Sequence, residues 1–216
     1  MEDYLKAIQQ IGATTGGTVT TQALADRLQV STASVTGMIK KLDTLRLVEH
    51  EPYHGVVLTA RGSAAALEVL RHHRLLELFL VEHLGVPWEE VHAEAERLEH
   101  HISEGLEERI AAKLGQPSHD PHGDPIPTAE GAMPARHHDS LLTCPLGTSL
   151  RMTRITDQDP AFLRFVERNG LKPGQVVEVE SRDTAADSVK LVGHGGVSIT
   201  IGARAASKLL VETPAD

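Results

Sequence analysis

Two histidines and two glutamates between positions 92 and 100 have the residue types and the spacing of a metal-binding cluster. They are His92, Glu96, Glu99 and His100, which stand at i, i+4, i+7 and i+8 and span about 100° of one helix face. Carboxylates and imidazoles this close beside an apolar stripe repel or desolvate one another unless a cation or a proton compensates them. The pattern therefore indicates a site for a divalent cation, with a solvated acidic helix face as the alternative.

A second pair of such residues lies on the preceding helix. His73 and Glu77 are four positions apart, at the margin of that helix's apolar stripe. A single His–Glu pair is more often a surface salt bridge than a metal site. Two sets on neighbouring helices, which can meet when the helices pair, favour metal binding over that alternative.

Both sets fall in an acidic, histidine-rich middle segment of the 216-residue chain. Residues 66–140 carry 6 basic and 15 acidic side chains and 10 of the 13 histidines, whereas residues 1–65 and 141–216 are each balanced in charge. A single cysteine, Cys144, excludes an intramolecular disulfide and a thiolate-rich zinc or iron–sulfur site. The 3% aromatic content argues against a base-stacking surface for single-stranded nucleic acid. Neither a membrane-span pattern nor a signal-peptide pattern is evident, so we expect a cytoplasmic protein without a membrane partner.

The elements that must position these residues begin with a helix-turn-helix. Apolar spacing predicts helices over residues 2–12, about 21–28 and 32–45, with Thr20 or Thr21 and Ser31 as caps of the second and third. Two short apolar runs, 47–48 and 56–58, flank the turn 52–55 and predict a β-hairpin. The order of a helix-turn-helix followed by a hairpin indicates a winged helix over residues 1–65.

Two longer helices follow, over about 59–84 and about 88–114. A helical hairpin cannot bury both of its apolar stripes alone, so we expect it to form a dimer interface, with packing on the first domain as the alternative. Residues 115–149 contain 6 of the 11 prolines and predict an extended connection, so the helical domain with its linker is assigned to residues 66–140.

Residues 141–216 are predicted to form a small β-barrel. Strand-like stretches cover 150–155, 176–179, 189–192 and 197–201, with a helix at 161–169. The predicted fold class is therefore mainly α with β: a winged helix, a helical dimerisation domain and a small barrel.

Several motifs taken together resemble the diphtheria-toxin-repressor family of metal-dependent transcriptional regulators, and its manganese-regulator branch in particular. The resemblance rests on residues 1–5, 31–36, 72–77, 91–103 and 122–127, and on a C-terminal part similar to the SH3-like (FeoA-type) domain of the longer members. Each motif is weak alone, but their order and spacing cover nearly the whole chain.

The resemblance implies two metal sites. Asp3, Glu96, Glu99 and His100 match the primary, activating site, and His73, Glu77 and His92 match an ancillary site. Some long members take ancillary ligands from the Pro-rich stretch and the SH3-like domain, and Asp120, His122 and Asp159 stand there in this chain. Oxygen at Asp3 and Glu96, where iron-sensing relatives carry sulfur, suits Mn²⁺. Lys6 stands where manganese regulators with a two-metal cluster have a second acid, which argues against that paired geometry.

The expected function is that of a homodimeric, Mn²⁺-activated repressor of metal-homeostasis genes that binds double-stranded operator DNA. A regulator of the same family that responds to Fe²⁺ or Zn²⁺ is the alternative. No motif of a catalytic assembly is present, so we expect no enzyme, and a metal-dependent hydrolase is the rival from another class. A winged-helix sensor of an organic ligand would need an aromatic-lined site that the composition does not favour.

The third helix is predicted to enter the major groove by its N-terminal turns. The residues expected at DNA are Ser31, Thr32, Ala33, Ser34, Thr36, Gly37, Lys40 and Lys41. Hydroxyl groups discriminate poorly between bases and the two lysines suit phosphates, so we expect modest base specificity supplemented by DNA shape. The alternative role of Ser31 is that of a helix cap alone.

Overall fold

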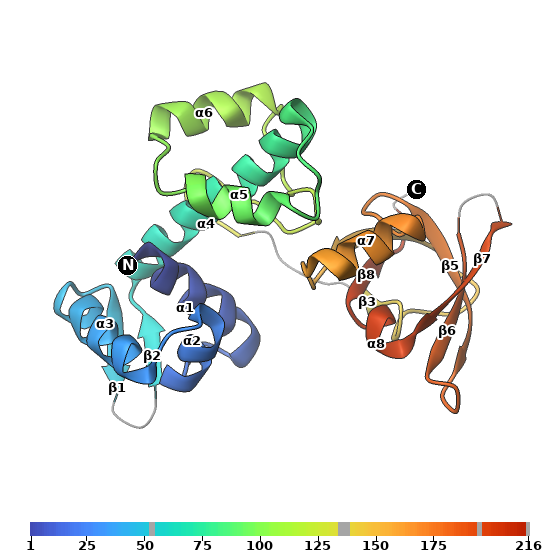
Figure 1. Cartoon of the computed structure of the whole chain (residues 1–216), viewed down its shortest axis with the longest axis horizontal. Coiled ribbons are helices and arrows are strands. Elements are labelled where there is room, and N and C mark those ends of the chain that lie inside the picture. The colour runs from blue at the N-terminus through green and yellow to red at the C-terminus, as the bar shows by residue number, and fades with distance from the viewer. Residues whose placement is uncertain (52–54, 134–138, 194–195, 215–216) are drawn as a thin grey trace. The chain divides into compact units, whose positions relative to one another are not determined.

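The structure is a computed structural model that describes the chain except residues 52–54, 134–138, 194–195 and 215–216 (Figure 1). The chain forms two compact units. The first comprises Met1–His73, Glu99–Ile102 and Pro127–Met133, and the second comprises Arg74–Leu98, Ser103–Ile126 and Pro134–Asp216.

The first unit contains the predicted winged helix. Its elements are α1 (Glu2–Thr15), α2 (Thr21–Leu28), α3 (Thr32–Thr44), β1 (Val48–Glu51), β2 (Gly55–Leu58) and the beginning of α4 (Ala60–Leu84). Strands β1 and β2 pair in antiparallel fashion from Val48 opposite Leu58 to Glu51 opposite Gly55. The predicted turn between them falls largely on residues 52–54, outside the described part of the chain. Apolar side chains from all of these elements form one buried core, including Leu5, Ile8, Leu24, Ile39, Leu42 and Val56.

Two side-chain caps set the geometry of the helix-turn-helix. Thr20 accepts a hydrogen bond from the Ala23 backbone N–H, and Ser31 accepts one from Ser34. Between the two helices Gln29 adopts a left-handed conformation, which turns the chain sharply. The predicted end of the first helix at Gly12 is wrong by almost one turn, because the left-handed Gly16, with φ 85°, ends the helix instead.

Close packing of α4 against the turn before β1 requires a glycine at position 62. A Cβ atom there would lie 1.8 Å from the Leu47 carbonyl oxygen, so the backbone would have to move. We expect Gly62→Ala to lower the free energy of unfolding by about 3 kcal/mol. Gly105→Ala is the matched control, since Gly105 also lies near a helix start but has open space around it, and it should stabilise by about 0.5–1 kcal/mol. Urea unfolding followed by circular dichroism measures both, and equal midpoints would contradict the packing argument.

The second unit contains the rest of α4 and two shorter helices, α5 (Val91–Leu98) and α6 (Glu104–Lys113). The prediction of one helix over about 88–114 is wrong, because the helix breaks after Leu98. Ser103 begins α6 as its cap and accepts a hydrogen bond from Leu106. No helix in the described ranges is long and apolar enough to cross a membrane.

Part of the Pro-rich connection folds into a tight turn in this unit. Ile126 donates its backbone N–H to Ser118, and Asp120 donates to Asp124. Gly123, with φ 85°, approaches strand β4 (Ser149–Ile155) so closely that a Cβ would lie 1.9 Å from the Thr153 carbonyl oxygen. The prediction of an extended connection therefore does not hold for residues 118–126.

The C-terminal part is a six-stranded antiparallel sheet with the order β3-β8-β4-β5-β6-β7. Its strands are β3 (Asp139–Ser140), β4 (Ser149–Ile155), β5 (Val176–Asp183), β6 (Ser188–Val192), β7 (Ser198–Gly202) and β8 (Leu209–Glu212), with helices α7 (Pro160–Arg168) and α8 (Ala203–Ala206). The four strands predicted from the sequence are present, and β3 and β8 were not predicted. The sheet and α7 enclose a second buried core, which includes Leu150, Leu163, Val179 and Leu191.

Candidate metal centres

A first cluster of ligand atoms lies in the first unit, where α1 meets residues 99–100. Asp3, Glu99 and His100 each offer one ligand atom, and these atoms lie within 4.8 Å of one another. His100 Nε2 is 2.7 Å from Asp3 Oδ1, and His100 Nδ1 is 2.5 Å from Glu2 Oε2. Asp3 comes from the first turn of α1, so this cluster joins the winged helix to the chain segment after α5.

Neighbouring charged groups shift the pKa values of Glu99 and His100 in this cluster. Burial would raise the pKa of Glu99, but the hydrogen bond and charge of His73 and the charge of Lys6 lower it overall. Burial would lower the pKa of His100, but its hydrogen bond to Glu2 and the charges of Asp3 and Glu99 raise it overall. The carboxylate of Glu99 is thus kept ionised, as a metal ligand must be.

Glu99 is the buried member of the first cluster and has both oxygens engaged. Lys6 Nζ donates to Oε1 at 2.5 Å, and His73 Nδ1 lies 2.5 Å from Oε2. Asp3 and His100 are more exposed, which leaves one side of the cluster open to solvent.

Glu96 is not gathered with these residues. Its carboxylate lies 3.5 Å from His92 Nε2, one turn earlier on α5, and its side chain is half exposed. Of the four residues predicted for the primary site, the structure therefore brings three together.

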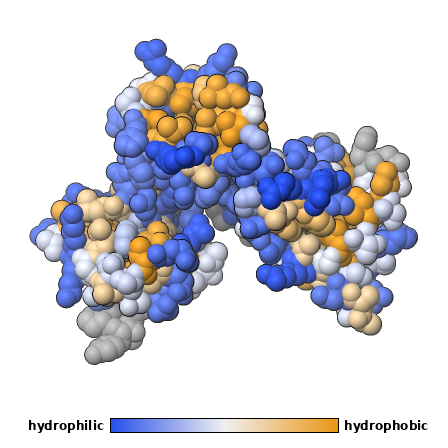
Figure 2. Space-filling model, viewed as in Figure 1, coloured by the Kyte–Doolittle hydropathy of each residue, from blue (hydrophilic) through white to orange (hydrophobic). Residues whose placement is uncertain are grey.

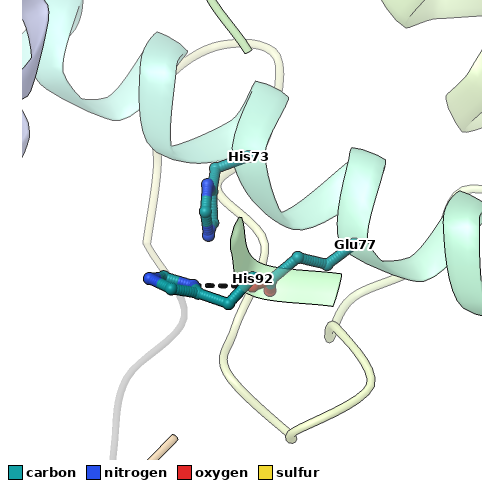
Figure 3. Close-up of side chains that lie close together, drawn as sticks. All are labelled: His73, Glu77 and His92. Atoms are coloured by element: carbon teal, nitrogen blue, oxygen red, sulfur yellow. Dashed lines mark hydrogen bonds and ion pairs between the residues drawn. The ribbon is translucent and has the colours of Figure 1, made fainter. Parts of the chain in front are cut away.

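A second cluster lies in the second unit and is fully buried. Glu77 of α4 and Asp120 and His122 of the tight turn 118–126 offer ligand atoms within 4.8 Å of one another. His122 Nδ1 is 3.8 Å from Glu77 Oε2, while His92 Nδ1 is 2.9 Å from Glu77 Oε1. Figure 3 shows this pairing of His92 with Glu77, and His73 one turn earlier on the same side of α4.

The second cluster contains buried polar atoms that fit a cation. His122 Nε2 is 2.9 Å from the Trp88 carbonyl oxygen, so the proton that it donates there leaves Nδ1 free to act as a ligand. His122 Nδ1 and Asp120 Oδ2 are both buried and have no hydrogen-bond partner among the described residues. Burial, together with the charges of Glu77 and Asp124, raises the pKa of Asp120 well above its usual range. Arg74 Nε lies 3.8 Å from Asp120 Oδ2 and compensates this charge only in part, since the pKa stays raised. A bound proton or cation would supply the rest, so the donor set fits a divalent ion.

Asp159 is gathered with neither cluster. Its Oδ1 accepts hydrogen bonds from the backbone of Ala161 and Phe162, which makes it the cap of α7 ahead of Pro160. The Asp-Pro pair at the start of an apolar helical stretch is the signal that identifies this cap from the sequence.

Three contacts of the clusters had not been predicted. Glu2 bonds His100, Lys6 bonds Glu99, and the Trp88 ring stacks on the His122 ring with centroids 5.5 Å apart. Glu2 and Lys6 lie close to Asp3 on α1, which is a usable signal, whereas nothing in the sequence connects Trp88 with His122.

The predicted DNA-contacting residues lie on the exposed face of α3. Ser31, Thr32, Ala33, Ser34, Thr36, Gly37, Lys40 and Lys41 are all exposed. Ser31 does cap the helix, and its hydroxyl also lies 2.9 Å from that of Ser34. Thr36 donates its hydroxyl proton to the Thr32 carbonyl, so it presents an acceptor to the solvent.

Comparison with known proteins covers nearly the whole chain. Residues 1–56 match the family described as iron dependent repressor, N-terminal DNA binding domain, residues 59–128 match its metal binding and dimerisation domain, and residues 140–213 match the FeoA domain. The iron-dependent repressor IdeR of Mycobacterium tuberculosis is 30% identical over 210 residues, which are 92% of this chain and 91% of that protein.

Solved structures agree with this assignment. A manganese-dependent transcriptional repressor in complex with manganese is 40% identical and superimposes with a TM-score of 0.89, over 99% of both chains. ScaR with bound Zn²⁺ is 33% identical with a TM-score of 0.78, again over 99% of both chains.

Proposed function

The chain belongs to the iron-dependent repressor family of metal-dependent transcriptional regulators, and from this premise we propose that it is a homodimeric repressor activated by Mn²⁺. In this proposal Asp3, Glu99 and His100 form the activating site. The observation that carries it is the donor set, which is made of carboxylate oxygen and imidazole nitrogen without sulfur. Carboxylate oxygen is a ligand type that suits Mn²⁺, whereas thiolate sulfur would select softer ions.

The activating site would work as a clamp between segments far apart in the sequence. Asp3 belongs to α1 of the DNA-binding fold, whereas Glu99 and His100 follow α5. A bound divalent cation supplies positive charge that offsets the repulsion between Asp3 and Glu99. The two carboxylates then hold α1 at residues 99–100 and so fix the position from which α3 meets DNA.

The dimer is proposed to form through the helical part of the second unit. Leu84, Leu98 and Leu106 are large apolar residues with 64%, 39% and 46% of their surface exposed. Figure 2 shows apolar side chains gathered over α5 and α6. A second copy of the chain that covers this face would place two α3 helices on one DNA duplex, as a repressor of paired half-sites needs.

The choice of ion is tested on the full chain stripped of metal. Its binding to random-sequence DNA duplexes is measured by fluorescence anisotropy with Mn²⁺, Fe²⁺ under anaerobic conditions, Zn²⁺ or Ca²⁺. We expect Mn²⁺ to give the strongest DNA binding when each ion is saturating and Ca²⁺ to have no effect, because the ligands distinguish the ions less by raw affinity, which is lowest for Mn²⁺, than by the geometry they permit. If Fe²⁺ or Zn²⁺ promoted DNA binding more strongly than Mn²⁺ does, the activating ion would be that one and not Mn²⁺. If the metal-loaded chain hydrolysed members of a metallohydrolase substrate panel, a metal-dependent hydrolase would be favoured instead.

We further propose that Glu77, Asp120 and His122 form an ancillary site. His122→Ala is expected to lower the Mn²⁺ content from about two ions to about one per chain, because the remaining ligands no longer complete the site. Trp88, the only tryptophan, stacks on His122, so Mn²⁺ at the ancillary site should quench its fluorescence.

His50→Ala is the matched control, because His50 is an exposed imidazole on β1. The variant should keep both the ion content and the quenching. Unchanged content and quenching in His122→Ala would show that the turn 118–126 holds no metal.

A further inference from the structure

A buried lysine lies inside the proposed activating site. Lys6 stands one helical turn after Asp3 on α1, and only 7% of its surface is exposed. Its Nζ is 2.5 Å from Glu99 Oε1, and only 1% of the Glu99 side chain is exposed. In the proposed activating site Glu99 is a metal ligand, whereas Lys6 is not.

The ion pair accounts for how Glu99 can stay ionised while buried. A buried carboxylate is costly unless an opposite charge and hydrogen bonds compensate it. Lys6 supplies that positive charge at one oxygen, and His73 occupies the other at 2.5 Å. When no ion is bound, the lysine ammonium therefore takes the place of a metal ion at Glu99 Oε1.

We propose that Lys6 sets the Mn²⁺ concentration at which the activating site fills. The ammonium and the divalent ion are like charges that compete for the same carboxylate, so Lys6 holds the affinity below the value that Asp3, Glu99 and His100 would give alone. Its charge also opposes a second ion beside the first. This inference rests on the proposed function of the site as a metal sensor, for which release of the ion at low concentration is as necessary as binding.

The test compares neutral and charged replacements in the full chain. Lys6→Met and Lys6→Gln remove the charge, and Lys6→Arg keeps it. All are made in a His122→Ala background so that the activating site is titrated alone. Free Mn²⁺ is measured by electron paramagnetic resonance. The control is Lys190→Met, which removes the same charge from an exposed pair with Glu180 on β6.

We expect both neutral variants to bind Mn²⁺ at least about tenfold more tightly than the parent, because a nearby positive charge has been removed. Lys6→Arg and Lys190→Met should match the parent. The rise in thermal midpoint on adding Mn²⁺ should also be larger for the neutral variants, and this readout covers a variant that is partly unfolded without the ion. The inference would be overturned if Lys6→Met and Lys6→Gln bound Mn²⁺ no more tightly than the parent. It would also be overturned if Mn²⁺ raised their thermal midpoints no more than it raises that of the parent.

The variant Asp3→Asn distinguishes a misassigned activating site from a purely structural role of Lys6. Asp3→Asn is made in the same His122→Ala background, and if it leaves Mn²⁺ binding unchanged, the activating site itself has been misassigned. If Asp3→Asn abolishes binding while the Lys6 variants bind like the parent, the site stands and Lys6 is a structural ion pair.

Discussion

Asp3→Asn is expected to weaken Mn²⁺ binding at the activating site by at least about 100-fold, since loss of mere supporting partners already costs 10–100-fold. Metal-dependent DNA binding should disappear with it. The substitution keeps the size of the side chain but removes the charge that faces His100 Nε2 at 2.7 Å. About half of the Asp3 side chain is exposed, so the fold should remain intact. Isothermal titration with Mn²⁺ measures the first effect and anisotropy with labelled duplex DNA measures the second.

Asp26→Asn provides the control for that change. Asp26 is an exposed acid on α2 of the same unit, where it accepts a hydrogen bond from Gln22. An asparagine can accept the same bond, so metal and DNA binding should both stay at the parent level. Equal losses in the two variants would mean that Asp3 acts through general charge and not as a ligand.

Replacing Lys40 and Lys41 together by alanine is expected to weaken DNA binding by about 100-fold or more at physiological salt, because each charged hydrogen bond to phosphate contributes on the order of 1.5 kcal/mol or more. The weakening should affect specific and random duplexes alike. The slope of log affinity against log salt should fall by roughly one unit for each lysine–phosphate pair removed from a half-site. Both lysines are exposed on α3, so the fold should tolerate the change.

Two controls separate this effect from net charge and from base recognition. The double variant Lys113→Ala and Lys190→Ala removes the same charge from α6 and β6 and should bind DNA almost as the parent does. Ser34→Ala should instead change the ratio between preferred and random duplexes. If the Lys40 and Lys41 variant keeps the parent's affinity and salt slope, α3 is not the helix that meets DNA.

Local signals in the sequence were sufficient to predict the winged helix and much of the sheet. The caps at Thr20 and Ser31 lie where hydroxyl residues precede apolar helical spacing, and the structure confirms both. The break after Leu98 could not be predicted in this way. It places Glu99 against Lys6 and His73, which are 93 and 26 positions away, so the interactions that shape this segment are long-range.

The candidate sites, like the fold, could be predicted from the sequence only in part. Asp3, Glu99 and His100 followed from residue type and from the family resemblance, and the structure gathers them. The link between His122 and Trp88 depends on how the turn 118–126 folds, and that turn is held by contacts such as Arg74 with Asp124 and Ile155 with His122. Because these partners are distant in sequence, no spacing rule reveals them.

We expect a divalent ion at Asp3, Glu99 and His100 to switch on sequence-selective DNA binding. The most direct test is selection from a pool of random-sequence duplexes by the full chain, in parallel with Mn²⁺ and with EDTA. An inverted-repeat sequence should be enriched with Mn²⁺ and not with EDTA, and Asp3→Asn should enrich nothing under either condition. Enrichment of the same sequence to the same degree with EDTA would mean that the ion does not control DNA binding.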